Sequence, residues 1–156
     1  MTEARVWQDL VENLPNGLPE AGDKGLDYTH TWGRTYWGGA LFWLLADIEI
    51  HKRTNGRRGV TDALRAVNAG GGTYAVEWSV EKVLQIADKG TDTHVLSEMY
   101  QRMSGSPQSV DLKSLWLSLG VSMRDGAISF DDTAPLASVR KAICEGSAGR
   151  SAARVN

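Results

Sequence analysis

The sequence has few of the residues that build covalent or metal-based sites. Cys144 is the single cysteine among 156 residues, so no disulfide can form within the chain. Its helical surroundings predict a small buried apolar residue rather than a nucleophile. The three histidines, His30, His51 and His94, lie far apart, and none begins a His-Glu-x-x-His pattern. No Gly-x-Ser-x-Gly stretch occurs either, so the sequence predicts no zinc ligands and no Ser-His-Asp site in this chain.

An excess of one charge and a long apolar run are also missing. Seventeen Lys and Arg residues stand against 19 Asp and Glu, a net charge of −2, which argues against nucleic-acid binding. The first ten residues, MTEARVWQDL, are charged and amphipathic and so are not typical of a signal peptide. The uncharged run 35–46 is too short to cross a bilayer. We therefore expect a soluble protein with no nucleic-acid or membrane partner, of unspecified compartment.

What the sequence does contain is regular helical patterning. Apolar residues make up 42% of the chain and charged residues 23%, both ordinary values for a globular protein. Apolar positions recurring every three or four residues predict helices near 2–13, 36–54, 62–69, 80–89, 93–103, 112–119 and 135–145. Asp125-Gly126, flanked by alternating apolar residues, predicts a β-hairpin between Val121 and Phe130. The predicted fold is mainly α, a multi-helix single domain with one β-hairpin near its C-terminus.

Composition divides the chain into three parts. Residues 1–27 read as an N-terminal helix followed by an irregular loop rich in proline and glycine. Residues 28–146 form the helical domain, and residues 147–156, rich in Ser, Ala, Gly and Arg, are predicted to be a disordered tail. The loop is long for a compact domain, and loops of that length are often functional or docked on another structure.

The helix predicted at 36–54 is the most apolar in the chain. Thr35 is a plausible N-cap, and apolar residues on most sides of the helix place it at the centre of the fold. Asp47 and Glu49 lie two residues apart and point in different directions, so capping, solvation or pairing with Arg53 is expected of them. Tyr36 follows the predicted cap directly, where it could serve packing, capping or chemistry.

The segment TYWGGALFWLLADIEIHKRTNGRRGVTDALRAV resembles the segment that follows the zinc site in glycyl-aminopeptidase-like gluzincin metallopeptidases. Tyr36 takes the position of the tyrosine in the family's Tyr-x-Lys-Gly-Ala-Leu motif, and residues 39–41 supply its Gly-Ala-Leu. Residues 47–50 are similar to the family's Asp-x-Glu-Ile helix end, and residues 60–65 to the cap and helix that follow. The later stretch VLSEMYQRMSGSPQSVDLKSLWLSLGV is also similar, so the resemblance covers about residues 28–121.

The resemblance implies a role for the start of this helix. In these peptidases the tyrosine donates a hydrogen bond to the oxyanion of the tetrahedral intermediate, opposite the zinc, so Tyr36 is the candidate catalytic residue. Gly38 and Gly39 would let substrate or neighbouring backbone approach closely, although Gly38 stands where the family has lysine. A core or capping tyrosine is the alternative for Tyr36.

The resemblance also implies partners. The family's zinc ligands precede this segment, so the chain looks like the C-terminal helical domain of a zinc-dependent aminopeptidase, without a cofactor of its own. Its expected partners are the upstream zinc domain of the same polypeptide and a peptide substrate. The isolated chain should bind no zinc and hydrolyse no peptide. An exposed apolar patch is expected around Trp32, Trp37 and the preceding loop, which self-association of the isolated chain could cover. The rival interpretation is a catalytically silent helical interaction module.

Overall fold

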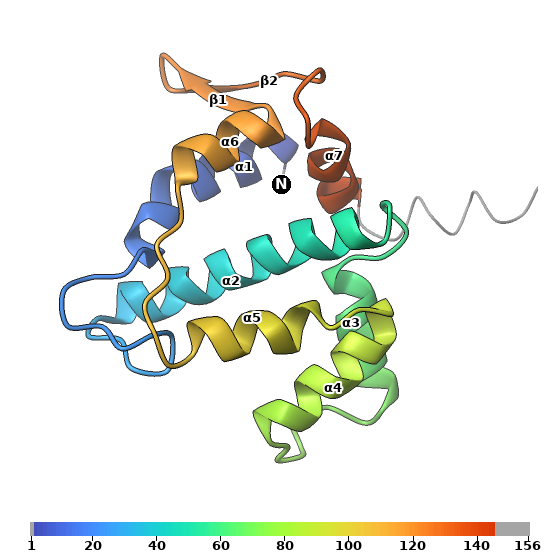
Figure 1. Ribbon diagram of the computed structural model, residues 1–156. Coiled ribbons are helices and arrows are strands. Elements are labelled where there is room, and N and C mark those ends of the chain that lie inside the picture. The colour runs from blue at the N-terminus through green and yellow to red at the C-terminus, as the bar shows by residue number, and fades with distance from the viewer. Residues whose placement is uncertain (1, 146–156) are drawn as a thin grey trace, which may run out of the picture.

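One long helix, α2 (Trp32–Arg53), organises the computed structural model, which describes residues 2–145. In Figure 1 this helix crosses the middle of the molecule, with α1, α6, α7 and the hairpin on one side and α3, α4 and α5 on the other. The remaining elements are α1 (Glu3–Asn13), η1 (Leu14–Gly17), α3 (Val60–Ala69), α4 (Val80–Thr91), α5 (Val95–Met103), α6 (Leu112–Leu119), β1 (Val121–Arg124), β2 (Ala127–Phe130) and α7 (Ala137–Glu145). The mainly α prediction is confirmed. The tail predicted at 147–156 lies outside the described residues.

Two apolar cores lie on opposite sides of α2. The first contains Trp7, Leu14, Leu41, Leu44, Ile48, Leu112, Leu119, Val121 and Val139. The second contains Phe42, Ala46, Ile50, Ala63, Leu84, Ala87, Val95, Leu96 and Met99. Because α2 supplies side chains to both, it is apolar around most of its circumference, as its sequence predicts.

The hairpin forms where the sequence predicts it. Strands β1 and β2 pair antiparallel, with Val121 opposite Phe130 and Arg124 opposite Ala127. Asp125 and Gly126 take φ values of 51° and 77°, the left-handed conformations that a two-residue type I′ turn requires. Asp125-Gly126 is therefore a turn of the expected kind.

Carboxylates, rather than the expected threonine, cap α3. The amide of Val60 donates to Asp47 Oδ1 at 2.7 Å, and the amide of Gly59 donates to Asp62 Oδ2 at 2.9 Å. Thr61 directly precedes the helix predicted at 62–69 and is the cap that the sequence predicts, but it lies within the helix, and Gly59 is the N-cap. The capping role expected of Asp47 is thus confirmed. So is ion pairing by Glu49, which contacts Lys52 at 2.8 Å and Arg53 at 3.1 Å.

A second carboxylate joins α4 to α5. Asp88, which is buried, accepts the amide hydrogens of Leu96 at 2.9 Å and Ser97 at 3.1 Å. These amides lie in the first turn of α5, where backbone N–H groups have no partner within the helix. Asp88 therefore caps the helix that follows its own, although a sequence separation of eight or nine residues hides this relation from a periodicity argument.

The C-terminal helix is held by a buried arginine and carries the cysteine. Arg140 donates from Nη1 to the carbonyls of Leu119 at 3.0 Å and Gly120 at 3.1 Å, which ties α7 to the end of α6. Cys144 is exposed, so the expectation of a buried cysteine is wrong. Its sulfur nevertheless accepts a hydrogen bond from Trp7 Nε1 at 3.1 Å, and partial burial raises the pKa of the thiol. A raised pKa disfavours the thiolate that a nucleophile needs.

Candidate functional site on the first half of α2

The helix that carries Tyr36 begins four residues earlier than expected. Thr31 has an extended backbone, and its hydroxyl accepts the amide hydrogen of Arg34 at 3.1 Å, so Thr31 is the N-cap. Thr35 lies within the helix and donates its hydroxyl hydrogen to the Thr31 carbonyl at 3.1 Å. The prediction of Thr35 as cap is therefore wrong. Tyr36 sits in the second turn, where the helix dipole offers an anion less stabilisation than in the first.

The loop before α2 is fastened by one buried carboxylate. Asp23 accepts hydrogen bonds from the Glu20 amide at 2.9 Å, from His30 Nδ1 at 3.1 Å and from Arg34 Nε at 2.8 Å. These contacts hold the pKa of Asp23 well below its usual range, the Glu20 amide contributing most. The side chains of Asp23 and Arg34 are both buried, whereas that of His30 is mostly exposed. The irregular loop thus has a fixed position against the first turn of α2.

The two glycines of the motif have different environments. A Cβ atom on Gly38 would clash with Arg34 Nη1 and lie 3.0 Å from Leu26 Cδ2. A Cβ atom on Gly39 would meet nothing within 4 Å. The space over Gly38 is therefore filled by Arg34, so packing alone accounts for a glycine there. Gly39 faces open space, where another molecule could approach the backbone closely.

An exposed aromatic stripe runs along α2. Trp32, Tyr36, Gly39 and Trp43 follow one another at spacings of four, three and four residues, which places them on one face of the helix. Trp32 is 80% exposed, Tyr36 56% and Trp43 38%, and the rings of Trp32 and Tyr36 stack with centroids 5.2 Å apart. Trp37, expected in an exposed patch, is instead partly buried against the first core. The exposed patch therefore includes Trp32 and Tyr36 but not Trp37.

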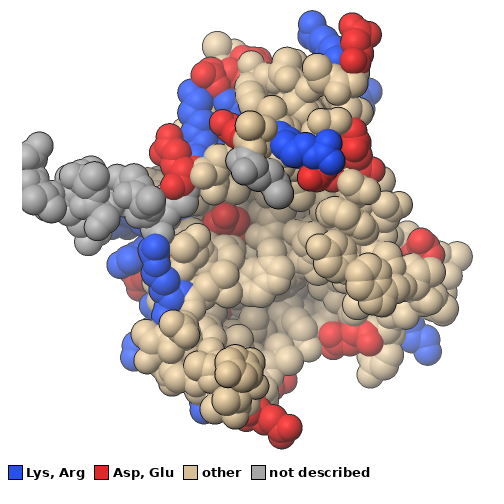
Figure 2. All heavy atoms as spheres, turned by 180° about the vertical axis from the view of Figure 1, so that it is seen from behind, with Lys and Arg blue, Asp and Glu red and all other residues tan. Residues whose placement is uncertain are grey.

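The residues of the stripe are themselves uncharged. Seen from behind, the middle of the molecule is largely free of Lys, Arg, Asp and Glu, which gather above it and around its edges (Figure 2). Tyr28, on the loop fastened by Asp23, is a separate aromatic residue that is 66% exposed. Exposed aromatic rings grouped in this way are typical of a surface that another molecule covers.

Tyr36 is neither buried in a core nor the cap of its helix. Its ring contacts Trp32 and, edge to face at 5.2 Å, Trp37, but more than half of the side chain is open to solvent. Within residues 2–145, no group exchanges a hydrogen bond with its hydroxyl. A phenol held by stacking, with its O–H available, can donate a hydrogen bond to a substrate oxygen. The alternative of a core or capping tyrosine does not match this position.

The three histidines stay apart in space. His30 contacts Asp23, His51 is buried with Nε2 3.5 Å from Asp47 Oδ1, and His94 precedes α5. In the described part of the chain, no three His, Cys, Asp or Glu residues are arranged to hold a metal ion.

Comparison with family models, with curated proteins and with solved structures gave no match to this chain. Across residues 2–145, no helix is both long enough and apolar enough to cross a membrane.

Proposed function

We propose that this chain is the C-terminal helical domain of a zinc-dependent aminopeptidase-like metallopeptidase, and that Tyr36 is its contribution to the active site. The zinc ligands would lie in an upstream part of the same polypeptide. The observation that carries the proposal is the position of Tyr36, with an available hydroxyl on an exposed, uncharged aromatic stripe. Such a stripe is costly to leave in water and is explained if another part of the protein covers it.

The chemistry assigned to this chain is a single hydrogen bond. Peptide hydrolysis passes through a tetrahedral intermediate whose former carbonyl oxygen carries negative charge, and a preorganised donor stabilises it. The Tyr36 O–H would be that donor, while the zinc, held elsewhere, would polarise the same carbonyl. Stacking on Trp32 restricts the ring, so little ordering is needed when the charge develops. The open backbone at Gly39, one helical turn further on, leaves room for the substrate chain.

The corner between α2 and α3 supports the resemblance in a second way. The Asp47, Gly59 and Asp62 positions fall within the similar segments, and the structure gives each a defined task at that corner. A Cβ atom on Gly59 would lie 2.7 Å from Asp47 Oδ1, so the capping carboxylate fits only against a glycine. The motif residues outside the stripe therefore serve folding, which leaves Tyr36 and Gly39 as the residues available for chemistry.

The experiment is to express the complete reading frame that contains these 156 residues and, separately, residues 1–156 alone. Each is assayed for aminoacyl-anilide hydrolysis and for bound zinc by mass spectrometry after dialysis. We expect one zinc per chain and activity in the complete product, and neither in residues 1–156. A complete product without zinc or peptidase activity would favour the silent interaction module. Tightly bound zinc in residues 1–156 would contradict the proposal that the zinc ligands lie in an upstream part of the polypeptide.

A further inference from the structure

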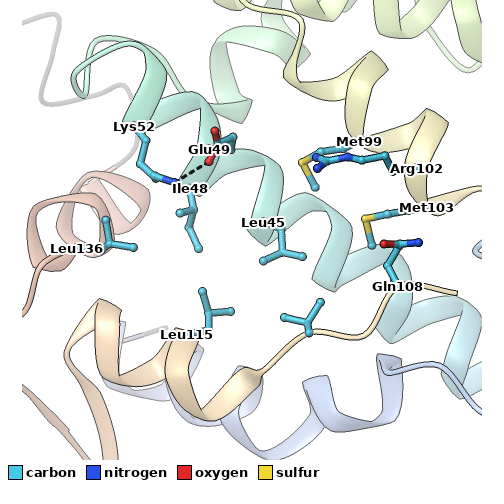
Figure 3. A pocket seen from close by; sticks show the side chains of 11 residues that line it. Leu45, Ile48, Glu49, Lys52, Met99, Arg102, Met103, Gln108, Leu115 and Leu136 are labelled. Atoms are coloured by element: carbon cyan, nitrogen blue, oxygen red, sulfur yellow. Dashed lines mark hydrogen bonds and ion pairs between the residues drawn. The ribbon is translucent and has the colours of Figure 1, made fainter.

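A cleft opens between α5 and α6, on a part of α2 that the aromatic stripe does not use. It has a volume of about 430 Å³, within the range of small-molecule sites. Leu45 and Ile48 of α2 point into it, and Leu115 of α6 faces them, as Figure 3 shows. The two cores of the protein diverge here, because α5 belongs to one and α6 to the other.

The lining is apolar over most of its area and adaptable on one side. Its apolar residues are Leu45, Ile48, Met99, Met103, Val110, Leu115 and Leu136. Met99 and Met103 both come from α5, and unbranched thioether side chains adjust readily to the shape of a ligand. A cleft with this lining would take an aliphatic chain.

The polar residues stand at the two ends of the cleft (Figure 3). At one end Lys52 is paired with Glu49 at 2.8 Å, and Glu49 is also bound by Arg53, so these charges are matched. At the other end lie Arg102 and Gln108. No carboxylate in residues 2–145 forms an ion pair with Arg102. The Glu98 carboxylate, one turn earlier on α5, interacts electrostatically with Arg102 but forms its ion pair with Arg53 at 2.8 Å. Arg102 therefore has room for a further anion, and it lies with Gln108 at one end of an apolar trough.

We propose that this cleft binds an aliphatic monocarboxylate, its carboxylate at Arg102 and Gln108 and its chain along Leu45, Ile48 and Leu115. Gln108 Nε2 donates one hydrogen to Ser106 Oγ at 3.1 Å, which leaves its second N–H for a ligand. A guanidinium and an amide N–H donor match a carboxylate in charge and hydrogen bonding. The apolar side chains along the cleft favour a ligand with an aliphatic chain over a small anion. The inference does not depend on the proposed peptidase role, because the cleft shares no residue with the stripe of Trp32, Tyr36, Gly39 and Trp43.

The test uses methyl NMR of the protein labelled at its methionine methyl groups, titrated with decanoate. Met99 and Met103 lie in the cleft, whereas Met123, on β1, is an internal control. We expect saturable shifts of the Met99 and Met103 signals and none of Met123. Decyltrimethylammonium, with the same chain length and opposite charge, should bind more weakly than decanoate, and acetate, which lacks the chain, should leave all three signals in place. 1-Decanol should bind more weakly than decanoate.

Matched variants locate the head group. Arg102→Gln should weaken decanoate binding about fivefold, as for an exposed ion pair, and leave 1-decanol binding unchanged. Arg124→Gln removes an exposed arginine from the hairpin and should change neither. Leu115→Trp should weaken both ligands by filling the cleft, and Val110→Phe serves if the first variant fails to fold by circular dichroism.

Three outcomes would overturn the proposal. The first is an absence of shifts at Met99 and Met103 at millimolar decanoate. The second is equal binding of decanoate and decyltrimethylammonium. The third is a decanoate affinity unaffected by both Arg102→Gln and the cleft-filling variant, because the ligand would then be bound elsewhere.

Discussion

Replacing Gly38 and Gly39 by alanine, one at a time, should have opposite effects on stability. Both glycines lie in the same turn of α2, so each substitution should gain about 1 kcal/mol of helix propensity. At Gly39 nothing opposes the gain, because a Cβ atom there meets open space. Gly39→Ala should therefore stabilise the protein by about 0.5–1 kcal/mol.

At Gly38 the added methyl group would displace a side chain that cannot easily move. Arg34 Nη1 occupies the site of the Cβ atom, and the Arg34 side chain is 4% exposed and bonded through Nε to Asp23. Overpacking of this kind costs about 1–3 kcal/mol, and the tethering of Arg34 puts the cost near the top of that range. After the propensity gain, Gly38→Ala should lose about 1–2 kcal/mol.

Urea and thermal unfolding measure both effects. For a chain of this length 1 kcal/mol moves the melting temperature by about 2–4 °C, so the two variants should differ by roughly 3–12 °C. In an Arg34→Ala background the clash is gone, and Gly38→Ala should become neutral or stabilising. Equal stabilisation by Gly38→Ala and Gly39→Ala in the wild-type background would refute the packing explanation for Gly38. A lysine at this position, which the family motif has, should be tolerated only when Arg34 is replaced.

The remaining predictions concern Asp23 in the loop before α2, Asp88 at the junction of α4 and α5, and the Cys144 thiol. Contacts in the folded state hold the pKa of Asp23 below that of an unfolded carboxyl. Its stabilising contribution is therefore present above about pH 4 and lost as the pH falls further. Urea unfolding at pH 7 and pH 3 should show that Asp23→Asn loses less stability on acidification than wild type. Asp88→Ala should cost about 1–2 kcal/mol by uncapping α5, and hydrogen exchange should rise at the amides of Leu96 and Ser97. The raised pKa of the Cys144 thiol predicts slower alkylation at pH 7 than in an unfolded control, with the gap closing at alkaline pH.

The sequence predicts the elements of this fold better than the contacts between them. Helical periodicity and the Asp125-Gly126 turn depend on neighbouring residues, so seven helices within residues 2–145 and the hairpin follow from local patterns. The N-cap of α2 shows the limit, because Thr31 and Thr35 are both suitable caps by residue type. Only the extended backbone at Thr31 decides between them.

The candidate site is likewise only partly predictable from the sequence. The spacing of Trp32, Tyr36 and Trp43 is visible in the sequence, but their exposure depends on where the two cores leave α2 uncovered. The Asp23–Arg34 bond joins residues eleven apart across an irregular loop, where no period relates them. The cleft at Arg102 could not be predicted from the sequence, because it arises where α5 and α6 diverge in space. Resemblance to a family pointed to Tyr36, and the structure adds the stacked, exposed setting of its ring.

Whether Tyr36 donates a hydrogen bond in catalysis is tested by Tyr36→Phe in the complete protein. With 56% of its side chain exposed and no hydrogen bond to any residue in 2–145, the hydroxyl contributes little to folding. The free energy of unfolding should stay within about 0.5 kcal/mol of wild type. Tyr74→Phe is the matched control, because Tyr74 is fully exposed on the loop between α3 and α4.

The measurement is kcat and KM for an aminoacyl-anilide, together with the melting temperature, for wild type, Tyr36→Phe and Tyr74→Phe. Loss of one oxyanion donor lowers kcat by about 10²–10³. KM should change little, because the bond forms mainly in the transition state. Tyr74→Phe should match wild type throughout. Wild-type kcat in Tyr36→Phe, in an active and folded protein, would contradict the claim and leave the stripe as a contact surface without a catalytic residue.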